Sequence, residues 1–234
     1  MHRMTDRSVD PRWPKLLSLS VHEFRTPMTV VAGYIRMLLK DRAGPLSDQQ
    51  RRLLEEAEKS CTRLSALLAE VSDLSNLEAG IAPFNRQSTD LRDLLRQAAS
   101  ELPPLPDREV RVDVKTGDGP AAITADVVRM RQALSSILAA LRRELVTSDC
   151  LLVEERAVRD KGPAAFELLV GDEKTLDAIR QANAVELPVF DEWRGGSGLS
   201  LAIARRVLNA HGGSISAPPG DGKAGARIVI PATH

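Results

Sequence analysis

The chain has 234 residues, enough for one large or two modest domains with hydrophobic cores. Its 32 basic and 32 acidic side chains leave no net charge, so no global basic field attracts nucleic acid or an anionic membrane. No apolar run approaches the roughly 20 residues of a membrane span, so we expect no membrane segment within this chain. The two cysteines, Cys61 and Cys150, form no disulfide framework, and a reducing, cytoplasmic setting is expected.

The first half of the chain predicts two long helices. From about Pro14 to Asp41, apolar residues recur at alternating spacings of four and three, the pattern of an amphipathic helix. These residues are Leu17, Val21, Phe24, Met28, Val31, Ile35 and Leu38. Gly44 and Pro45 then interrupt the helix, and Ser47 is expected to cap a second helix over about residues 48–78. The apolar stripe of that helix comprises Leu54, Ala57, Cys61, Leu64, Leu68 and Val71.

Two helices of this length joined by a short loop predict an antiparallel hairpin. A hairpin alone buries only one side of each apolar stripe. The wide stripes therefore favour a second copy of the chain, which would complete a homodimeric four-helix bundle. The alternative is that the hairpin packs on the remainder of its own chain.

The first helix carries a candidate nucleophile, His22. It follows Val21 directly, about 100° around the helix from the apolar seam, so we expect its side chain to be exposed. A lone exposed histidine is usually an ordinary surface residue, but here Glu23 can orient the imidazole or take its proton and leave one ring nitrogen free. Thr26 lies one turn on, on the same face, where its hydroxyl can position a water. Pro27 cannot donate to the Glu23 carbonyl, so a kink is expected there.

Beyond a boundary near residues 79–88, predicted helices alternate with predicted strands. The expected helices cover about residues 90–99, 126–144 and 199–210, and the expected strands 110–114, 150–153, 165–170, 214–216 and 226–230. This alternation, with few tight hairpin signals, predicts an α/β sandwich in which helices cover one sheet.

A glycine-rich segment at residues 194–201, Arg-Gly-Gly-Ser-Gly-Leu-Ser-Leu, opens the 199–210 helix. Gly196 and Gly198 let the backbone approach an anion, and the helix N-terminus offers free N–H groups and a favourable dipole. These features indicate a phosphate-binding loop. An ordinary glycine-containing loop before a helix is the alternative.

The segment His-Glu-Phe-Arg-Thr-Pro at residues 22–27 closely resembles the H-box of two-component sensor histidine kinases, and residues 73–80 resemble the end of that family's second helix. The resemblance implies a dimerisation and histidine-phosphotransfer domain over residues 1–80. It implies a catalytic ATP-binding domain over residues 81–234, an α/β sandwich of the histidine kinase, Hsp90 and gyrase type. By the same resemblance His22 is the phospho-acceptor, Glu23 its acid/base partner, and Thr26 a residue for phosphatase activity.

The resemblance further implies ATP and Mg²⁺ as cofactors and the receiver domain of a response regulator as partner. The glycine-rich segment resembles the family's G2 box, with Ser200 in place of its last glycine, so Gly196, Gly198 and Leu199 would contact the nucleotide. Only residues 173–195 separate this box from the preceding nucleotide motif, so a short lid over the nucleotide is expected.

Two other nucleotide motifs depart from the family pattern. Asp172 aligns with the adenine-reading aspartate of the G1 box, but Lys174 and Leu176 replace its two glycines. The two asparagines of the N-box fall at Ser136 and Ala140. Ala140 stands at the position of the family's magnesium ligand and has no oxygen to offer a hard cation, so no metal ligand is expected there.

Two functions are therefore open. In the first, the chain is a histidine kinase core that phosphorylates His22 from ATP and passes the phosphoryl group to an aspartate of a receiver domain. In the second, the nucleotide domain is degenerate, and the chain is a phosphotransfer, phosphatase or docking module without efficient ATP-dependent autophosphorylation. The intact H-box supports both functions, whereas Ala140, Lys174 and Leu176 favour the second.

Overall fold

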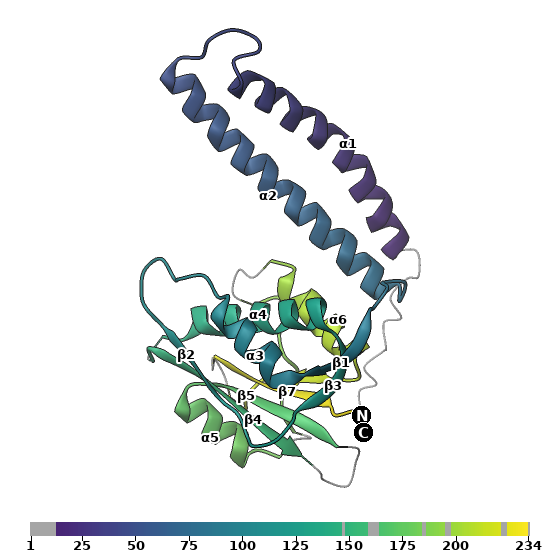
Figure 1. The fold of residues 1–234 in the computed structure, drawn as a ribbon, viewed down its shortest axis with the longest axis vertical. Coiled ribbons are helices and arrows are strands. Elements are labelled where there is room, and N and C mark those ends of the chain that lie inside the picture. Colours follow the sequence, from purple (N-terminus) through teal and green to yellow (C-terminus); the bar gives the residue numbers. More distant parts are fainter. Residues whose placement is uncertain are drawn as a thin grey trace, which may run out of the picture. The chain divides into compact units, whose positions relative to one another are not determined.

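The computed structural model describes residues 13–146, 148–158, 164–183, 186–194, 198–220 and 224–233. The chain divides into two compact units between Ala82 and Pro83 (Figure 1). Within the described ranges, no helix combines the length and the apolar character that crossing a bilayer requires.

The first unit is a hairpin of two helices, α1 (Trp13–Leu39) and α2 (Asp48–Glu78), which lie side by side (Figure 1). The predicted cap of the second helix is confirmed. The hydroxyl of Ser47 accepts a hydrogen bond from the backbone N–H of Gln50, whose side chain accepts one in return from the Ser47 N–H at 2.9 Å. This reciprocal pair satisfies two N–H groups that the start of a helix leaves without partners.

The interior of the hairpin forms around Ala32, Ile35 and Cys61. The Arg51 guanidinium closes the turn end of this interior, since it contacts the Asp41 carboxylate at 2.8 Å and donates to the carbonyl of residue 39. Several seam residues stay exposed because one hairpin covers only one side of each stripe. The exposed apolar side chains of the two helices are Trp13, Leu16, Leu19, Phe24, Val30, Val31, Tyr34, Met37, Leu53, Leu64 and Leu67.

The second unit contains a five-stranded mixed sheet in the order β2-β4-β5-β7-β6. Its strands are β2 (Arg111–Lys115), β4 (Cys150–Val158), β5 (Ala165–Gly171), β6 (Ser214–Ser216) and β7 (Gly225–Pro231). Only the β2–β4 pair is parallel. A separate antiparallel pair joins β1 (Arg86–Asp90) to β3 (Ala122–Asp126). Strand β1 contains no apolar residue, so no alternation of apolar and polar residues predicted it.

Helices α3 (Leu91–Ser100), α4 (Val127–Glu144) and α6 (Ser200–Ala210) lie over one face of the five-stranded sheet, and α5 (Glu173–Gln181) lies against the other (Figure 1). The predicted α/β sandwich is confirmed. Along β5, Leu168 and Leu169 are both buried although they point to opposite faces of the sheet. Helices on both faces explain this burial. Helix α5 was not predicted: the sequence analysis aligned its first residues with the G1 box and assigned the segment from residue 173 to a short lid.

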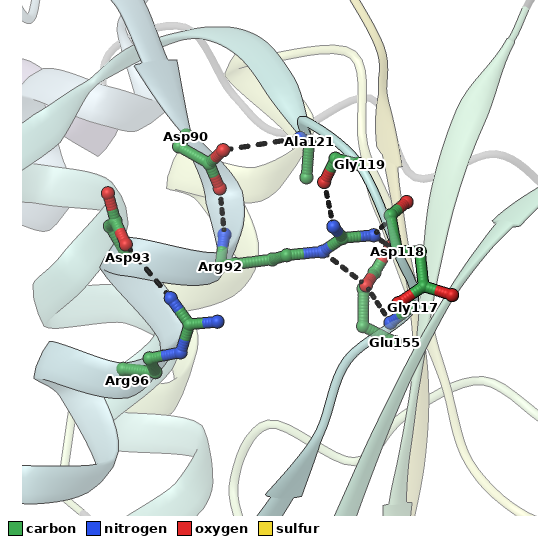
Figure 2. Close-up of polar contacts among 9 residues, drawn as sticks. All are labelled: Asp90, Arg92, Asp93, Arg96, Gly117, Asp118, Gly119, Ala121 and Glu155. Atoms are coloured by element: carbon green, nitrogen blue, oxygen red, sulfur yellow. Dashed lines mark hydrogen bonds and ion pairs between the residues drawn. The ribbon is translucent and has the colours of Figure 1, made fainter.

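A buried ion pair joins α3 to the sheet (Figure 2). The Arg92 guanidinium contacts the Glu155 carboxylate at 2.8 Å, and the exposed fractions of the two side chains are 8% and 0%. The same guanidinium donates to the carbonyl of Gly119, while the backbone N–H of Gly117 donates to Glu155 at 2.9 Å. Asp90 caps α3 by accepting from the Arg92 backbone N–H at 2.8 Å. These contacts fix the β2–β3 loop between α3 and β4.

Candidate functional site

The H-box residues lie on one exposed stretch of α1. As expected, the His22 side chain is exposed (76%), and its Nδ1 lies 3.4 Å from Oε1 of Glu23. A proton on Nδ1 therefore faces a carboxylate, which leaves the Nε2 lone pair free on the outer side of the ring. Thr26 is also exposed and lies one turn further along, followed by Pro27 inside the helix. The kink at Pro27 and the chemical roles of these residues remain predictions.

A cavity of about 500 Å³ borders His22 in the hairpin unit. From α1 it is lined by Lys15 and Ser18, which precede His22 by two turns and one turn, and from α2 by Asn76. The sequence analysis missed these residues. Their helical spacing could have revealed Lys15 and Ser18, because residues four and seven positions apart share a helix face. No local pattern identifies Asn76, which only the fold brings to this place.

Asp172, the expected adenine contact, lies at the end of β5 and is the N-cap of α5. Its Oδ1 accepts a hydrogen bond from the backbone N–H of Thr175 at 2.8 Å. A carboxylate is suited to this position because it satisfies a free N–H and complements the helix dipole. Within the described residues, this contact gives Asp172 a structural role that requires no nucleotide.

The residues that replace the G1 glycines belong to α5. Leu176 is fully buried and packs with Leu169 and Ile179, whereas Lys174 is exposed. The Thr175 side chain packs against Gly171 of β5 and Gly225 of β7, and it leaves no room for a larger residue at either glycine. A Cβ added to Gly171 or Gly225 would lie 2.8 or 2.5 Å from the Thr175 Cγ2. The start of α5 is thus packed tightly against the sheet.

The N-box positions lie on α4, which packs beside α6. Ser136 is half-buried, and Ala140 is only 1% exposed. One turn beyond Ala140, the Glu144 carboxylate pairs with Arg194 at 3.0 Å. Burial raises the pKa of Glu144, and the charge and hydrogen bond of Arg194 act in the opposite direction. The face of α4 expected to hold a metal therefore carries a methyl group and an ion pair.

Residues 186–194, here named the lid segment, are held to the domain at several points. Phe190 is 1% exposed, and the Arg194 guanidinium lies 5.1 Å from the centre of its ring. Glu192 is also buried and contacts Arg205 at 2.9 Å and Arg206. The Ala217 backbone N–H donates to the carbonyl of residue 188 at 2.9 Å. The sequence analysis missed these anchors, since ion pairs between separate elements leave no local signal.

The glycine-rich loop is described only in part. Gly196 lies outside the described residues. Gly198 has a φ of 60°, a left-handed conformation that favours glycine, and Leu199 precedes the first turn of α6. The N-cap residue Leu199 makes no side-chain capping hydrogen bond. A helix N-terminus in general directs backbone N–H groups toward an anion.

His211, at the C-terminal end of α6, has a structural role. Its Nδ1 lies 2.7 Å from the Val207 carbonyl, and its Nε2 accepts a hydrogen bond from the Asp126 backbone N–H at 3.0 Å. The Asp126 carboxylate in turn accepts from the N–H groups of Arg129 and Asn85. Burial, the largest single effect, raises the pKa of Asp126, but the two backbone hydrogen bonds and the nearby charge of Arg129 together lower it below its usual value.

Comparisons with known proteins identify similar chains. Residues 15–80 match the His Kinase A (phospho-acceptor) domain. The chain is 27% identical over 213 residues to the sensor protein GacS of Pseudomonas syringae pv. syringae, a match that covers 86% of this chain and 23% of that protein. It is 30% identical over 214 residues to the signal transduction histidine-protein kinase BarA of Escherichia coli (strain K12), covering 83% of this chain and 22% of that protein.

Among solved structures, the fold is similar to that of full-length ShkA, which was crystallised in complex with AMPPNP. The TM-score is 0.67 at 24% identity, and the match covers 94% of this chain and 45% of ShkA. The chain thus spans less than a quarter of the length of the two sequence relatives described above.

Proposed function

Because this chain belongs to the two-component sensor histidine kinases, we propose that it is the kinase core of a phosphorelay and that His22 carries the phosphoryl group. One observation carries the proposal: within the phospho-acceptor segment, an exposed histidine has Nδ1 beside the Glu23 carboxylate and Nε2 free. The proposed acceptor of the phosphoryl group is an aspartate in the receiver domain of a response regulator. The proposed place of action is the cytoplasm.

The chemistry follows from the orientation of the ring. The Nε2 lone pair attacks the phosphorus of a donor, so an N–P bond forms while the bond to the leaving oxygen breaks. Glu23 holds the Nδ1 proton and stabilises the positive charge that develops on the ring. In the second step a carboxylate oxygen of the receiver attacks the phosphorus, the N–P bond breaks, and the electron pair returns to Nε2. The Thr26 hydroxyl is proposed to position a water for hydrolysis of the receiver's acyl phosphate.

The proposed assembly is a homodimer built on the first unit. Support comes from the exposed apolar side chains on both helices of the hairpin, among them Phe24 and Tyr34, each 60% exposed. Apolar surface of this extent on a helical hairpin favours a covering partner. A second hairpin would bury it in a four-helix bundle around residues 1–80, with residues 81–234 as the attached catalytic domain.

The proposed phosphoryl donor is ATP. The described residues of the second unit suit a phosphate group better than they suit Mg²⁺. The N-terminus of α6, whose N-cap residue Leu199 makes no capping bond, and Gly198 suit a phosphate group. Ala140 offers no oxygen for Mg²⁺ and is almost completely buried, so the residues present do not fit the metal. The carboxylate of Asp172 is engaged by the Thr175 N–H.

A second function is favoured by these departures, above all by the burial of Leu176 in α5. In it, the chain exchanges phosphoryl groups between His22 and receiver domains, or docks them, without efficient autophosphorylation from ATP. Both functions need His22. They differ only in the origin of the phosphoryl group.

Two phosphoryl donors separate the two functions. The chain is incubated with radiolabelled ATP and Mg²⁺, or with phosphoramidate, a small donor that phosphorylates histidine without a kinase domain. An acid-labile, alkali-stable label from both donors, absent in His22→Ala, supports the kinase core. A label from phosphoramidate alone supports the second function, and a label that persists in His22→Ala contradicts both. Glu56→Gln, which changes only an exposed pair with Lys59 on α2, serves as a folded control that retains His22 and Glu23.

A further inference from the structure

Arg142 on α4 is a buried arginine without a carboxylate partner. Its exposed fraction is 7%, and its only side-chain hydrogen bond among the described residues is the one that Nη2 donates to the Pro103 carbonyl. The Nε atom of Arg142 is buried and has no hydrogen-bond partner among the described residues. The other buried arginine of this unit, Arg92, has a matched carboxylate in Glu155. The fold thus compensates one buried guanidinium and leaves the other uncompensated.

The surroundings of Arg142 disfavour its charge. Burial lowers its pKa, and the neighbouring Arg143 acts in the same direction. A guanidinium nevertheless keeps its proton at physiological pH, so the cost of burial falls on the folded protein. An anion beside Arg142 would remove that cost.

Arg142 lines an open cavity of about 780 Å³ between the end of α3, residues 101–110, β2 and α4. Its lining is about equally polar and apolar, and the apolar part includes Leu102, Leu105, Val110 and Val112. Two further arginines, Arg108 and Arg111, line it with a single acidic residue, Glu109. Arg108 is held in place because it donates to the Arg143 carbonyl at 2.9 Å. The volume lies in the range of small-molecule sites, and the lining combines apolar walls with an excess of positive charge.

We propose that this cavity binds a small organic carboxylate with an apolar body. The carboxylate lies against Arg142 and Arg108, where a planar guanidinium can contact both of its oxygens. The hydrocarbon part covers Leu102, Leu105 and Val110. The apolar half of the lining favours a molecule with a hydrocarbon body over inorganic phosphate, which has no apolar surface to bury. The site lies in the second unit and is independent of the proposed chemistry at His22.

Octanoate tests the proposal on the full chain. Two control probes are used: octan-1-ol, which has the hydrocarbon chain but no carboxylate, and inorganic phosphate, which has the charge but no hydrocarbon chain. Titration calorimetry and thermal unfolding are measured with each probe. We expect saturable octanoate binding and a rise in Tm, and neither effect with the alcohol or with phosphate. Equal effects of octanoate and octan-1-ol, equal effects of octanoate and phosphate, or no saturable octanoate binding at millimolar concentration would overturn the proposal.

Variants identify the place of binding. Arg142→Met should leave the Tm of the ligand-free protein unchanged or higher and remove the octanoate effect. Arg96→Met, which removes an exposed arginine paired with Asp93 elsewhere on α3, should keep that effect. If Arg142→Met does not fold, two other variants decide the matter: Arg108→Met, which removes a positive charge, and Leu105→Glu, which introduces a negative charge into the cavity wall. Each should weaken octanoate binding at least tenfold, and unchanged binding in both would refute the site.

Discussion

The carboxylate of Asp172 accepts a hydrogen bond from the backbone N–H of Thr175, so the residue that aligns with an adenine-reading aspartate begins a helix. Helix α5 then places Leu176 against Leu169 on the face of the sheet opposite α4. The segment after β5 is thereby folded into the core of the domain, where it stabilises the sheet.

Asp172→Ala is expected to lower the free energy of unfolding by about 1 kcal/mol, the usual effect of losing an N-cap. Asp172→Asn should be nearly neutral, because an amide oxygen also caps a helix. Urea denaturation followed by circular dichroism measures both variants. The capping role would be insufficient if Asp172→Asn kept its stability and yet abolished labelling of His22 from ATP.

Glu23→Gln should slow phosphoryl transfer to and from His22 on the order of 100-fold, because general acid–base catalysis supplies effects of that size. Single-turnover transfer from phosphorylated chain to a receiver domain measures the rate.

Thr26→Ala should retain transfer and lose hydrolysis of the phosphorylated receiver. Equal loss of transfer and hydrolysis in Thr26→Ala would indicate a positioning role for the hydroxyl in both reactions.

Phe24→Glu is expected to shift the chain from dimer to monomer, because it places a charge on the exposed apolar face of the hairpin. Val128→Glu is a matched control in the second unit, where Val128 is 54% exposed. Light scattering at micromolar concentration distinguishes the two states. A monomeric unsubstituted chain would refute the dimer.

Glu155→Gln should destabilise the second unit by roughly 3–5 kcal/mol, since it leaves the buried Arg92 charge without its partner. The double replacement Arg92→Met with Glu155→Leu should recover much of that loss. The exposed pair Arg96–Asp93 provides the control, and breaking it should cost less than about 1 kcal/mol. Denaturant unfolding of Glu155→Gln, the double replacement and Arg96→Met measures these costs, and a similar cost for both pairs would contradict the burial argument.

The lowered pKa of Asp126 predicts that the free energy of unfolding of the second unit depends on pH. Its folded-state pKa lies below the ordinary value of 3.8, so the stabilisation is fully present above that value and is lost as the pH falls through the folded-state pKa. Asp126→Asn should therefore be less stable than the unsubstituted chain at neutral pH, and the difference should shrink below pH 3.8. Urea midpoints across this range measure it. A difference that is constant with pH would assign the effect to shape rather than charge.

The sequence predicted the elements whose signals are local. The heptad spacing fixed α1 and α2 within about two residues of their ends, and the pattern around Ser47 identified a cap. Strand β1 was missed because Arg-Gln-Ser-Thr-Asp carries no apolar alternation, and its partner β3 could not be paired without it. Helix α5 does carry a helical signal in Leu176 and Ile179, three residues apart behind an aspartate. The alignment with a nucleotide motif obscured it.

The same distinction separates the two parts of the candidate site. The exposure of His22 follows from an angle around one helix, so one sequence sufficed to predict it. The Glu144–Arg194 contact joins residues fifty positions apart. Glu192 of the lid segment pairs with Arg205 and Arg206, which lie on α6. Such contacts depend on tertiary packing, which single-sequence periodicity does not encode.

The hydroxyl of Ser75 donates to the Pro14 carbonyl at 2.6 Å, and Ser75 is 2% exposed. This bond joins α1 to α2 two turns before His22. A rotation of α1 about its own axis would turn the imidazole toward or away from an approaching phosphoryl group, and the same rotation would have to break the bond. The Ser75–Pro14 bond therefore opposes such a rotation by about 1 kcal/mol, the usual net contribution of one hydrogen bond.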